Sequence, residues 1–131
     1  MFKIEPIRTK EEQRKYCELC RIEYDEDYLA YAAFIDGAFS GMCQFRIIGD
    51  AGMIRDLVPL PGVDDFEVMF IMGRSTMNFI DLCGVHLCRA RKDAGEKRLL
   101  LGIGFRDVGE DTLFADMTGM FDGSHCASKH E

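Results

Sequence analysis

The residues best suited to binding or catalysis lie where an expected strand, residues 53–58, leads into an expected helix through the loop 59–65. A helix that follows a strand in this way can bind an anion, because its first N–H groups have no partner and its dipole favours negative charge. In this chain Asp64, Asp65 and Glu67 stand at the helix start, so the chain's own carboxylates occupy the anion position. We expect them to stabilise the helix, by about 0.3–1 kcal/mol each, rather than to act in acid–base chemistry.

Asp56, on the same strand, is the candidate for a catalytic base. A carboxylate at this position could take a proton from an amine, directly or through a water molecule. Charged residues on strands more often pair with a neighbouring charge, and Arg55 or Arg46 could be that partner. The sequence therefore leaves two roles open for Asp56, catalysis and ion pairing.

The cysteines are candidates for a disulfide framework or a metal site, and they are Cys17, Cys20, Cys43, Cys83, Cys88 and Cys126. We expect them to be reduced and most of them to be packed in the core, since free cysteine is among the most buried residue types. Cys17 and Cys20 share one face of an expected helix. A metal site there would need two further ligands, for which only the C-terminal residues His125, Cys126 and His130 are available, so we expect no metal.

The size, composition and net charge of the chain limit the classes of protein to which it can belong. With 131 residues the chain has the size of one domain, and 47% apolar with 30% charged residues is typical of a globular protein. Its net charge of −7 argues against nucleic acid as a partner and favours cationic molecules such as amines. Apolar runs such as Val68–Met72 are too short to cross a membrane, and the N-terminus lacks the apolar segment of a signal peptide. We therefore expect a cytoplasmic protein that binds neither nucleic acid nor membranes.

Apolar periodicity and turn residues predict the strands that position these residues. Strands are expected over residues 2–7, 28–35, 38–48, 53–60 and 85–89, with a last strand pair at 104–105 and 112–117. Asp36-Gly37 has the composition of a two-residue hairpin turn between the second and third strands.

Helix signals fall between these strands. Thr9 and Glu12 form a capping box that opens a helix to about Tyr24. The strongest helical pattern covers residues 64–83 and ends at Gly84, and a short helix is expected to start at residues 93–96 and to run through residue 101. The order β-α-β-β-β-α-β-α-β predicts an α+β (mixed α/β) fold, with a mixed sheet that begins as an antiparallel meander. Residues 1–121 are expected to form a single domain and 122–131 a polar C-terminal tail.

Three short segments of the chain are similar to motifs of a known protein family. They are a turn glycine followed by a strand glycine (Gly37, Gly41), the segment Leu57-Val58-Pro59 at the end of the central strand, and the late pair Gly104-Phe105. Over roughly residues 2–118 the chain resembles the GNAT superfamily of acyl-CoA-dependent N-acetyltransferases. The resemblance implies an acyl-CoA N-acyltransferase-like fold that uses acetyl-CoA or another acyl-CoA.

The resemblance also implies where such a site would be. The cofactor would lie against Val58, Pro59, Leu60, Gly62 and Val63, with N–H groups near Val58 to Leu60 polarising the thioester carbonyl. Asp56 would be the base, and the acceptor would be a small amine or a peptide N-terminus. The acidic residues 23 and 25–27 lie where that family builds its acceptor site, although a solvated loop is the simpler account of them.

Three elements of the family pattern are absent. The pyrophosphate loop of the family reads Arg/Gln-x-x-Gly-x-Gly, and the corresponding positions here are Gly62, Asp65 and Glu67. Asp and Glu bring bulk and negative charge where Gly would let a phosphate approach the backbone. The tyrosine that often protonates the departing thiolate corresponds to Leu100, and a frequent asparagine falls near Asp93. With Asp65 and Glu67 at its glycine positions, the loop that would hold the CoA pyrophosphate is degenerate.

Two functions remain open on this basis. The first is a CoA-dependent N-acyltransferase that acts on an unknown amine. The second is a catalytically inactive GNAT-like module that binds another ligand or a partner protein. A homodimer is also left open by the sequence.

Overall fold

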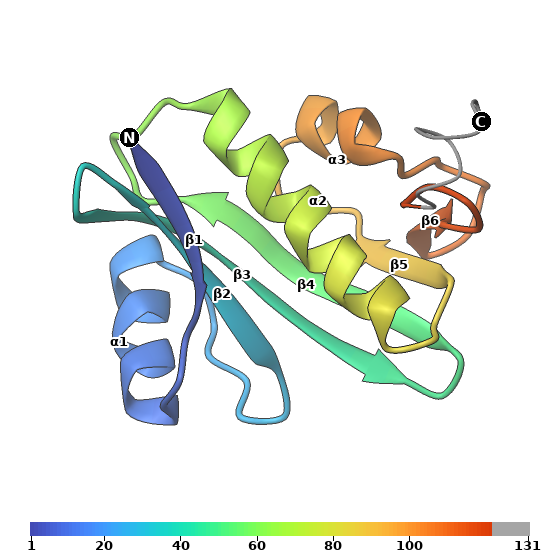
Figure 1. Cartoon of the computed structure of the whole chain (residues 1–131), viewed down its shortest axis with the longest axis horizontal. Helices are drawn as coiled ribbons and strands as arrows, with labels where there is room; N and C mark the ends of the chain where they lie inside the picture. Colours follow the sequence, from blue (N-terminus) through green and yellow to red (C-terminus); the bar gives the residue numbers. More distant parts are fainter. Residues whose placement is uncertain (122–131) are drawn as a thin grey trace, which may run out of the picture.

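The computed structural model describes residues 1–121, and their elements follow the predicted order (Figure 1). The strands are β1 (Phe2–Pro6), β2 (Leu29–Ile35), β3 (Ala38–Ile48), β4 (Ala51–Pro59), β5 (Leu87–Arg91) and β6 (Thr112–Asp116). The helices are α1 (Lys10–Cys20), α2 (Phe66–Leu82) and α3 (Lys97–Ile103). The tail expected over residues 122–131, with His125, Cys126 and His130, lies outside the described residues.

The described strands form one sheet in which the strand order follows the sequence, from β1 to β6. Strands β1 to β4 pair antiparallel, β4 and β5 pair parallel, and β5 and β6 pair antiparallel. Helix α2 is the crossover connection that the parallel pair requires. The predicted α+β fold, a mixed sheet that begins as an antiparallel meander, is confirmed.

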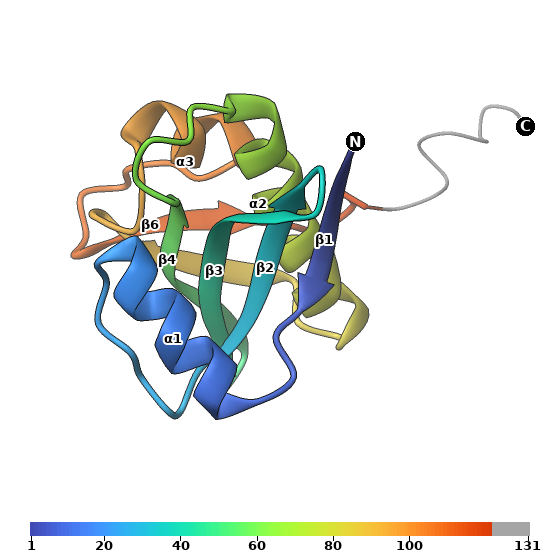
Figure 2. The same cartoon turned by 90° about the vertical axis from the view of Figure 1, so that its left-hand side faces the viewer.

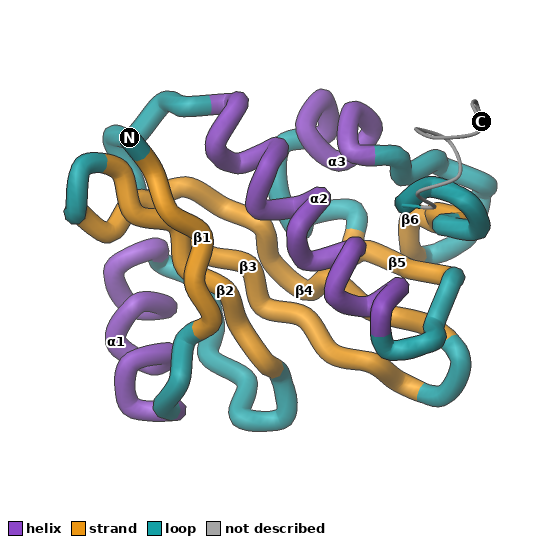
Figure 3. Tube along the Cα trace, in the orientation of Figure 1, coloured by secondary structure: helices purple, strands orange, loops and turns teal. Residues whose placement is uncertain are grey.

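The helices cover both faces of the sheet. Helix α1 lies on one face (Figure 2), and α2 and α3 lie together on the other (Figure 3). Because side chains alternate along a strand, Met42 of β3 packs with Cys17 and Cys20 of α1, whereas Cys43 joins the core beneath α2. No helix among residues 1–121 combines the length and the apolar character needed to cross a bilayer.

Helix α1 starts where the capping box predicted but ends earlier than expected. Thr9 is its N-cap, and the Thr9 hydroxyl accepts a hydrogen bond from the backbone N–H of Glu12 at 3.1 Å. The helix ends at Cys20 because Arg21 adopts the left-handed conformation, with φ of 60°, and its N–H bonds back to carbonyls of the last turn. Tyr24, expected in the helix, therefore lies in the loop that follows it.

Helix α2 differs from its prediction at the start, and the last strand pair differs more. The helix begins at Phe66 rather than at residue 64, with Asp65 as its N-cap. The expected strand at Gly104-Phe105 is reduced to a single bridge between Arg106 and Phe114. Gly104, with φ of 125°, ends α3, and β6 already pairs with β5 along its whole length.

Candidate functional site

The expected site lies where β4 and β5 part. The two strands pair only from Ala51 to Ile54 on β4, although β4 continues to Pro59. In the ladder between β3 and β4 the register shifts at this point, so that Arg55 is an extra residue opposite β3. Such a bulge turns Arg55 toward the same face as Asp56, whereas regular alternation would separate them. Both side chains lie on the face of the sheet that α1 covers.

The gap between the parted strands is filled by the chain itself. The backbone N–H of Leu57 donates a hydrogen bond to the carbonyl oxygen of Ala94, at 2.7 Å. Ala94 is completely buried. The next residue, Gly95, packs directly on the backbone of Leu57, so closely that a Cβ atom at Gly95 would collide with the Leu57 carbonyl oxygen. The segment after β5 thus takes the place beside β4 where an extended ligand could bind.

Further backbone donors of the expected cofactor segment, those of Leu60 and Val63, are also bonded within the protein. Val58 pairs with Met42 of β3, and Pro59 has no N–H. The N–H of Leu60 donates to the carbonyl oxygen of Ser40 at 2.8 Å, and the N–H of Val63 donates to that of Leu60 at 2.9 Å. The latter bond closes a turn with Pro61 and Gly62 at its centre, and the φ of 94° at Gly62 explains the glycine there.

The N-terminus of α2 is capped by one of the acids expected there, Asp65. The carboxylate of Asp65 accepts a hydrogen bond from the N–H of Val68 at 3.1 Å, which confirms the predicted role at this position in stabilising the helix start. A cavity of about 140 Å³ remains beside it, lined by residues of β4, α2 and α3 and by residues that precede the two helices, among them Asp64, Asp65 and Glu96. The one basic side chain in that lining, Arg98, lies 4.2 Å above the ring of Phe66.

Asp56 sits in a buried polar network rather than in an open site. The amide nitrogen of Gln44 donates to Oδ2 of Asp56 at 2.8 Å, and the guanidinium of Arg55 donates to the same oxygen at 3.1 Å. Gln44, itself fully buried, accepts a bond from the side chain of Gln13 on α1 at 2.8 Å. The expected ion pair of Asp56 is thus formed, and Arg55 is the partner, whereas Arg46 lies over the ring of Tyr28.

Burial has the largest effect on the protonation of Asp56. It raises the pKa of the Asp56 carboxyl, and the hydrogen bond from Gln44 and the charge of Arg55 lower it to a smaller extent. A raised pKa suits a proton acceptor, but the side chain is only 8% exposed, so a substrate amine has little access to it.

The acidic residues after α1 surround a cation of the protein's own. The guanidinium of Arg55 forms an ion pair with Glu23 and lies 3.9 Å from the carboxylate of Asp25. Arg55 is buried, whereas Glu23 is largely exposed. The negative charge of these acidic residues, which the resemblance assigned to an amine acceptor site, is therefore partly neutralised by Arg55.

The comparisons with known proteins identify this arrangement at the level of the fold. No protein-family model matches the sequence, and no curated protein sequence matches it. Solved structures do match: the PaiA N-acetyltransferase of Thermoplasma acidophilum in complex with coenzyme A has a TM-score of 0.67 at 14% identity over 87% of this chain and 96% of that one. The chain has the GNAT fold.

Two further GNAT structures support this assignment. A GNAT family acetyltransferase from Brucella melitensis in complex with acetyl-CoA gives a TM-score of 0.66 at 14% identity, over 88% of each chain. The ribosomal-protein-alanine N-acetyltransferase of Escherichia coli gives 0.67 at 11% identity, over 89% of this chain and 94% of that one. Structures of this kind have been determined with coenzyme A or acetyl-CoA bound, and at such identities the likeness concerns the fold.

Within the GNAT fold, the positions that depart from the family pattern have structural roles. Leu100, at the position of the tyrosine acid, is fully buried in the core beneath α3. Asp93, near the position of the asparagine, forms an ion pair with Arg91 at 3.0 Å. Val58, Pro59, Leu60, Gly62 and Val63 lie in sequence along the end of β4 and the turn after it, and their assignment to a cofactor stays a prediction.

The cysteines of the described chain are packed in the core, with one exception. Cys17, Cys20, Cys43 and Cys88 are buried, as predicted for most of them, and only Cys83 is exposed. Burial raises the pKa of Cys17 to about 11 and that of Cys43 to about 12. In residues 1–121 no group of three or more His, Cys, Asp or Glu side chains is placed to hold a metal ion.

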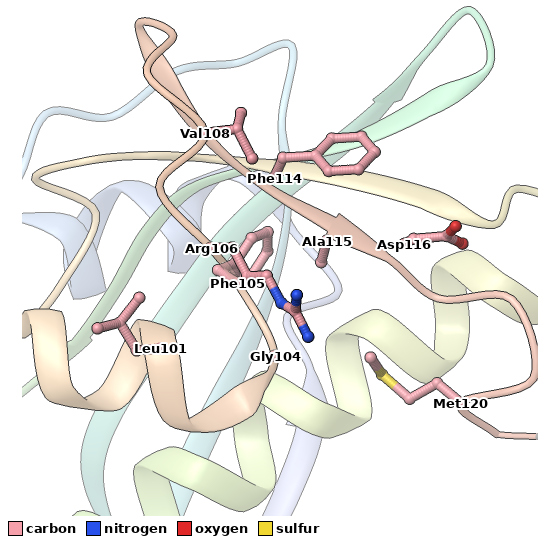
Figure 4. Close-up of a pocket in the computed structure, with 9 residues that line it drawn as sticks. All are labelled: Leu101, Gly104, Phe105, Arg106, Val108, Phe114, Ala115, Asp116 and Met120. Carbon is pink, nitrogen blue, oxygen red and sulfur yellow. The ribbon is translucent and has the colours of Figure 1, made fainter.

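A hollow that the sequence did not indicate lies between the end of α3 and β6 (Figure 4). Its volume is about 680 Å³, and its lining is mostly apolar, with Leu101, Val108, Phe114 and Met120 around Arg106. These residues lie between positions 101 and 120, in α3, the loop after it, β6 and the turn after β6, and they follow no periodic pattern. Only the tertiary structure brings them together.

Proposed function

We propose that residues 1–121 form a single GNAT-fold domain that acts in the cytoplasm as a binding module and does not hold acyl-CoA between β4 and β5. The observation that carries this proposal is the hydrogen bond from Leu57 to Ala94. An extended ligand that lies between two parted strands needs their free backbone groups, in the way that a peptide adds to a sheet edge. Here segment 92–96 of the chain already accepts the hydrogen bond of one such group, the N–H of Leu57.

The surroundings of the gap support the same conclusion. The backbone donors of Leu60 and Val63 are bonded within the protein, and the carboxylate of Asp65 caps the helix that would receive a diphosphate. Leu100, buried in the core, offers no proton to a departing thiolate. Binding in the cofactor position would require the protein to break these bonds without a compensating basic loop.

A second candidate is a CoA-dependent N-acyltransferase that modifies a small amine or a peptide N-terminus. It is favoured by the fold's likeness to acetyltransferases with coenzyme A or acetyl-CoA bound, and by the parting of β4 and β5 next to Asp56. In this function the segment 92–96 would have to leave Leu57 when the cofactor enters. Asp56 would then take the proton of the amine.

Titration calorimetry and thermal unfolding with coenzyme A and with acetyl-CoA, at millimolar ligand, separate the two functions. The binding module predicts no saturable heat and no increase in the melting temperature. An acyltransferase predicts both, together with thiol release when a panel of amines is added. Coenzyme density along β4 in a co-crystal would overturn our proposal.

A further inference from the structure

Strand β1 is an edge of the sheet, and half of its backbone groups have no partner in it. It lies next to β2 at the end of the strand order, and no other strand of residues 1–121 pairs with its outer side (Figure 2). The N–H of Ile7 donates to Ala30, and the N–H of Asp36 donates to the carbonyl of Met1, so the odd-numbered residues bond to β2. In an antiparallel ladder bonded and non-bonded pairs alternate, which turns the backbone groups of Phe2, Ile4 and Pro6 outward.

The sequence of β1 is complementary to itself. We infer that two copies of this protein form a dimer in which β1 pairs antiparallel with β1 of the second copy, about a two-fold axis at Ile4. In this register the N–H and C=O of Ile4 bond to the same groups of the other Ile4. The N–H of Phe2 donates to the carbonyl of Pro6 in the other copy, and Pro6, which has no N–H, is tolerated because it faces an edge.

The charges of β1 select this register. Around Ile4, Lys3 of each copy lies opposite Glu5 of the other, and opposite charges across a strand pair are stabilising. A shift by two residues in either direction would place Lys3 opposite Lys3 or Glu5 opposite Glu5. A shift by one residue would present backbone groups that are already bonded to β2. Both side chains are exposed, and neither has an ion-pair partner within residues 1–121.

The side chains on the other face of β1 are apolar. Ile4 packs against the main core, and Phe2, two residues away on the same face, is 37% exposed. The pairing would bring Phe2 against Pro6 and Ile4 against Ile4 of the second copy. Leu82, at the end of α2, is 76% exposed and lines a hollow of about 260 Å³ together with Ile4. A two-fold contact buries the same patch on both copies, which makes this face suited to self-association.

Sedimentation velocity across a range from micromolar to near-millimolar protein tests the inference. We expect a monomer–dimer equilibrium, because an interface built on one short strand is small. Lys3→Glu or Glu5→Lys alone creates like-charge pairs at both ends and should weaken the dimer about tenfold or more. The double exchange, Lys3→Glu with Glu5→Lys, restores opposite charges and should restore the dimer.

Matched variants exclude simpler explanations. Asp111→Lys makes the same change of net charge as Glu5→Lys but lies before β6, at the opposite edge of the sheet, and should leave the dimer intact. Unchanged thermal unfolding of each variant at low concentration shows that it folds. A wild-type protein that stays monomeric throughout, or a dimer that survives both single reversals, would overturn the inference.

Discussion

The backbone N–H of Leu57 in β4 donates to the carbonyl oxygen of Ala94, which follows β5, at a distance of 2.7 Å. This bond joins β4 to the segment after β5, beyond the point where the regular pairing of the two strands ends at Ile54. It brings Gly95 into direct contact with the backbone of Leu57. At this point the gap between β4 and β5 is therefore occupied by main chain.

We expect Gly95→Ala to destabilise the protein by about 1–3 kcal/mol or more, because its Cβ would collide with backbone and the strands would have to shift. Gly102→Ala is the matched control. It lies in α3, where a Cβ would meet its nearest side-chain atom at 3.7 Å. That variant should be stabilised, by about 0.5–1 kcal/mol, since alanine is the better helix former. Urea denaturation measures both, and equal effects would contradict the close contact at Gly95.

Asp65→Gly combined with Glu67→Gly recreates the glycine positions of the family loop. We expect no gain in affinity for coenzyme A, because the Leu57–Ala94 bond remains. The variant should lose a little stability, since the N-cap carboxylate of Asp65 is removed. Calorimetry with coenzyme A gives the answer. Saturable binding by this variant but not by the wild type would mean that the acids alone had blocked the site.

Asp56 should make the stability of the protein fall as the pH rises. Burial raises the pKa of its carboxyl in the folded state above the value in the unfolded chain. The folded protein therefore binds this proton more tightly than the unfolded chain does. The contribution of Asp56 to stability is greatest below about pH 4, declines as the pH rises through the raised pKa, and is constant above it. The decline must be measured against a variant without this carboxyl, because the lowered pKa values of Asp93, Asp107 and Asp116 change stability in the opposite direction over the same range.

Asp56→Asn isolates that contribution, because an amide oxygen can still accept from Gln44 and Arg55 but cannot ionise. The difference in stability between the variant and the wild type should shift in favour of the variant as the pH rises. A constant difference would show that the pKa of Asp56 is not raised.

Thiol reactivity should be confined to one described cysteine. In a Cys126→Ser variant, iodoacetamide at neutral pH is expected to modify Cys83, which is exposed, well ahead of the rest. Burial raises the pKa of Cys20, Cys43 and Cys88 to about 12, so few of these buried thiols are thiolates near neutral pH. Mass spectrometry locates the label. Rapid modification of Cys17 or Cys20 would show that α1 opens in the native protein.

Local patterns determined much of the fold. Apolar periodicity and turn chemistry predicted the order of all the described elements, and the Thr9 cap and the Asp36-Gly37 turn are where the sequence placed them. These features depend on residues close together in the chain, so short-range rules suffice to predict them. The burial of Cys17 and Cys20 also followed from spacing alone, because i and i+3 share a helix face.

The candidate functional site depends on tertiary contacts, which local sequence patterns do not predict. The sequence offered Arg55 as a partner of Asp56, but adjacent residues on a regular strand point to opposite faces, and only the bulge against β3 brings them together. Likewise, nothing near Leu57 in the chain indicates that Ala94 occupies its N–H. That pairing joins residues far apart in sequence, and the packing of the segment after β5 against β4 decides it.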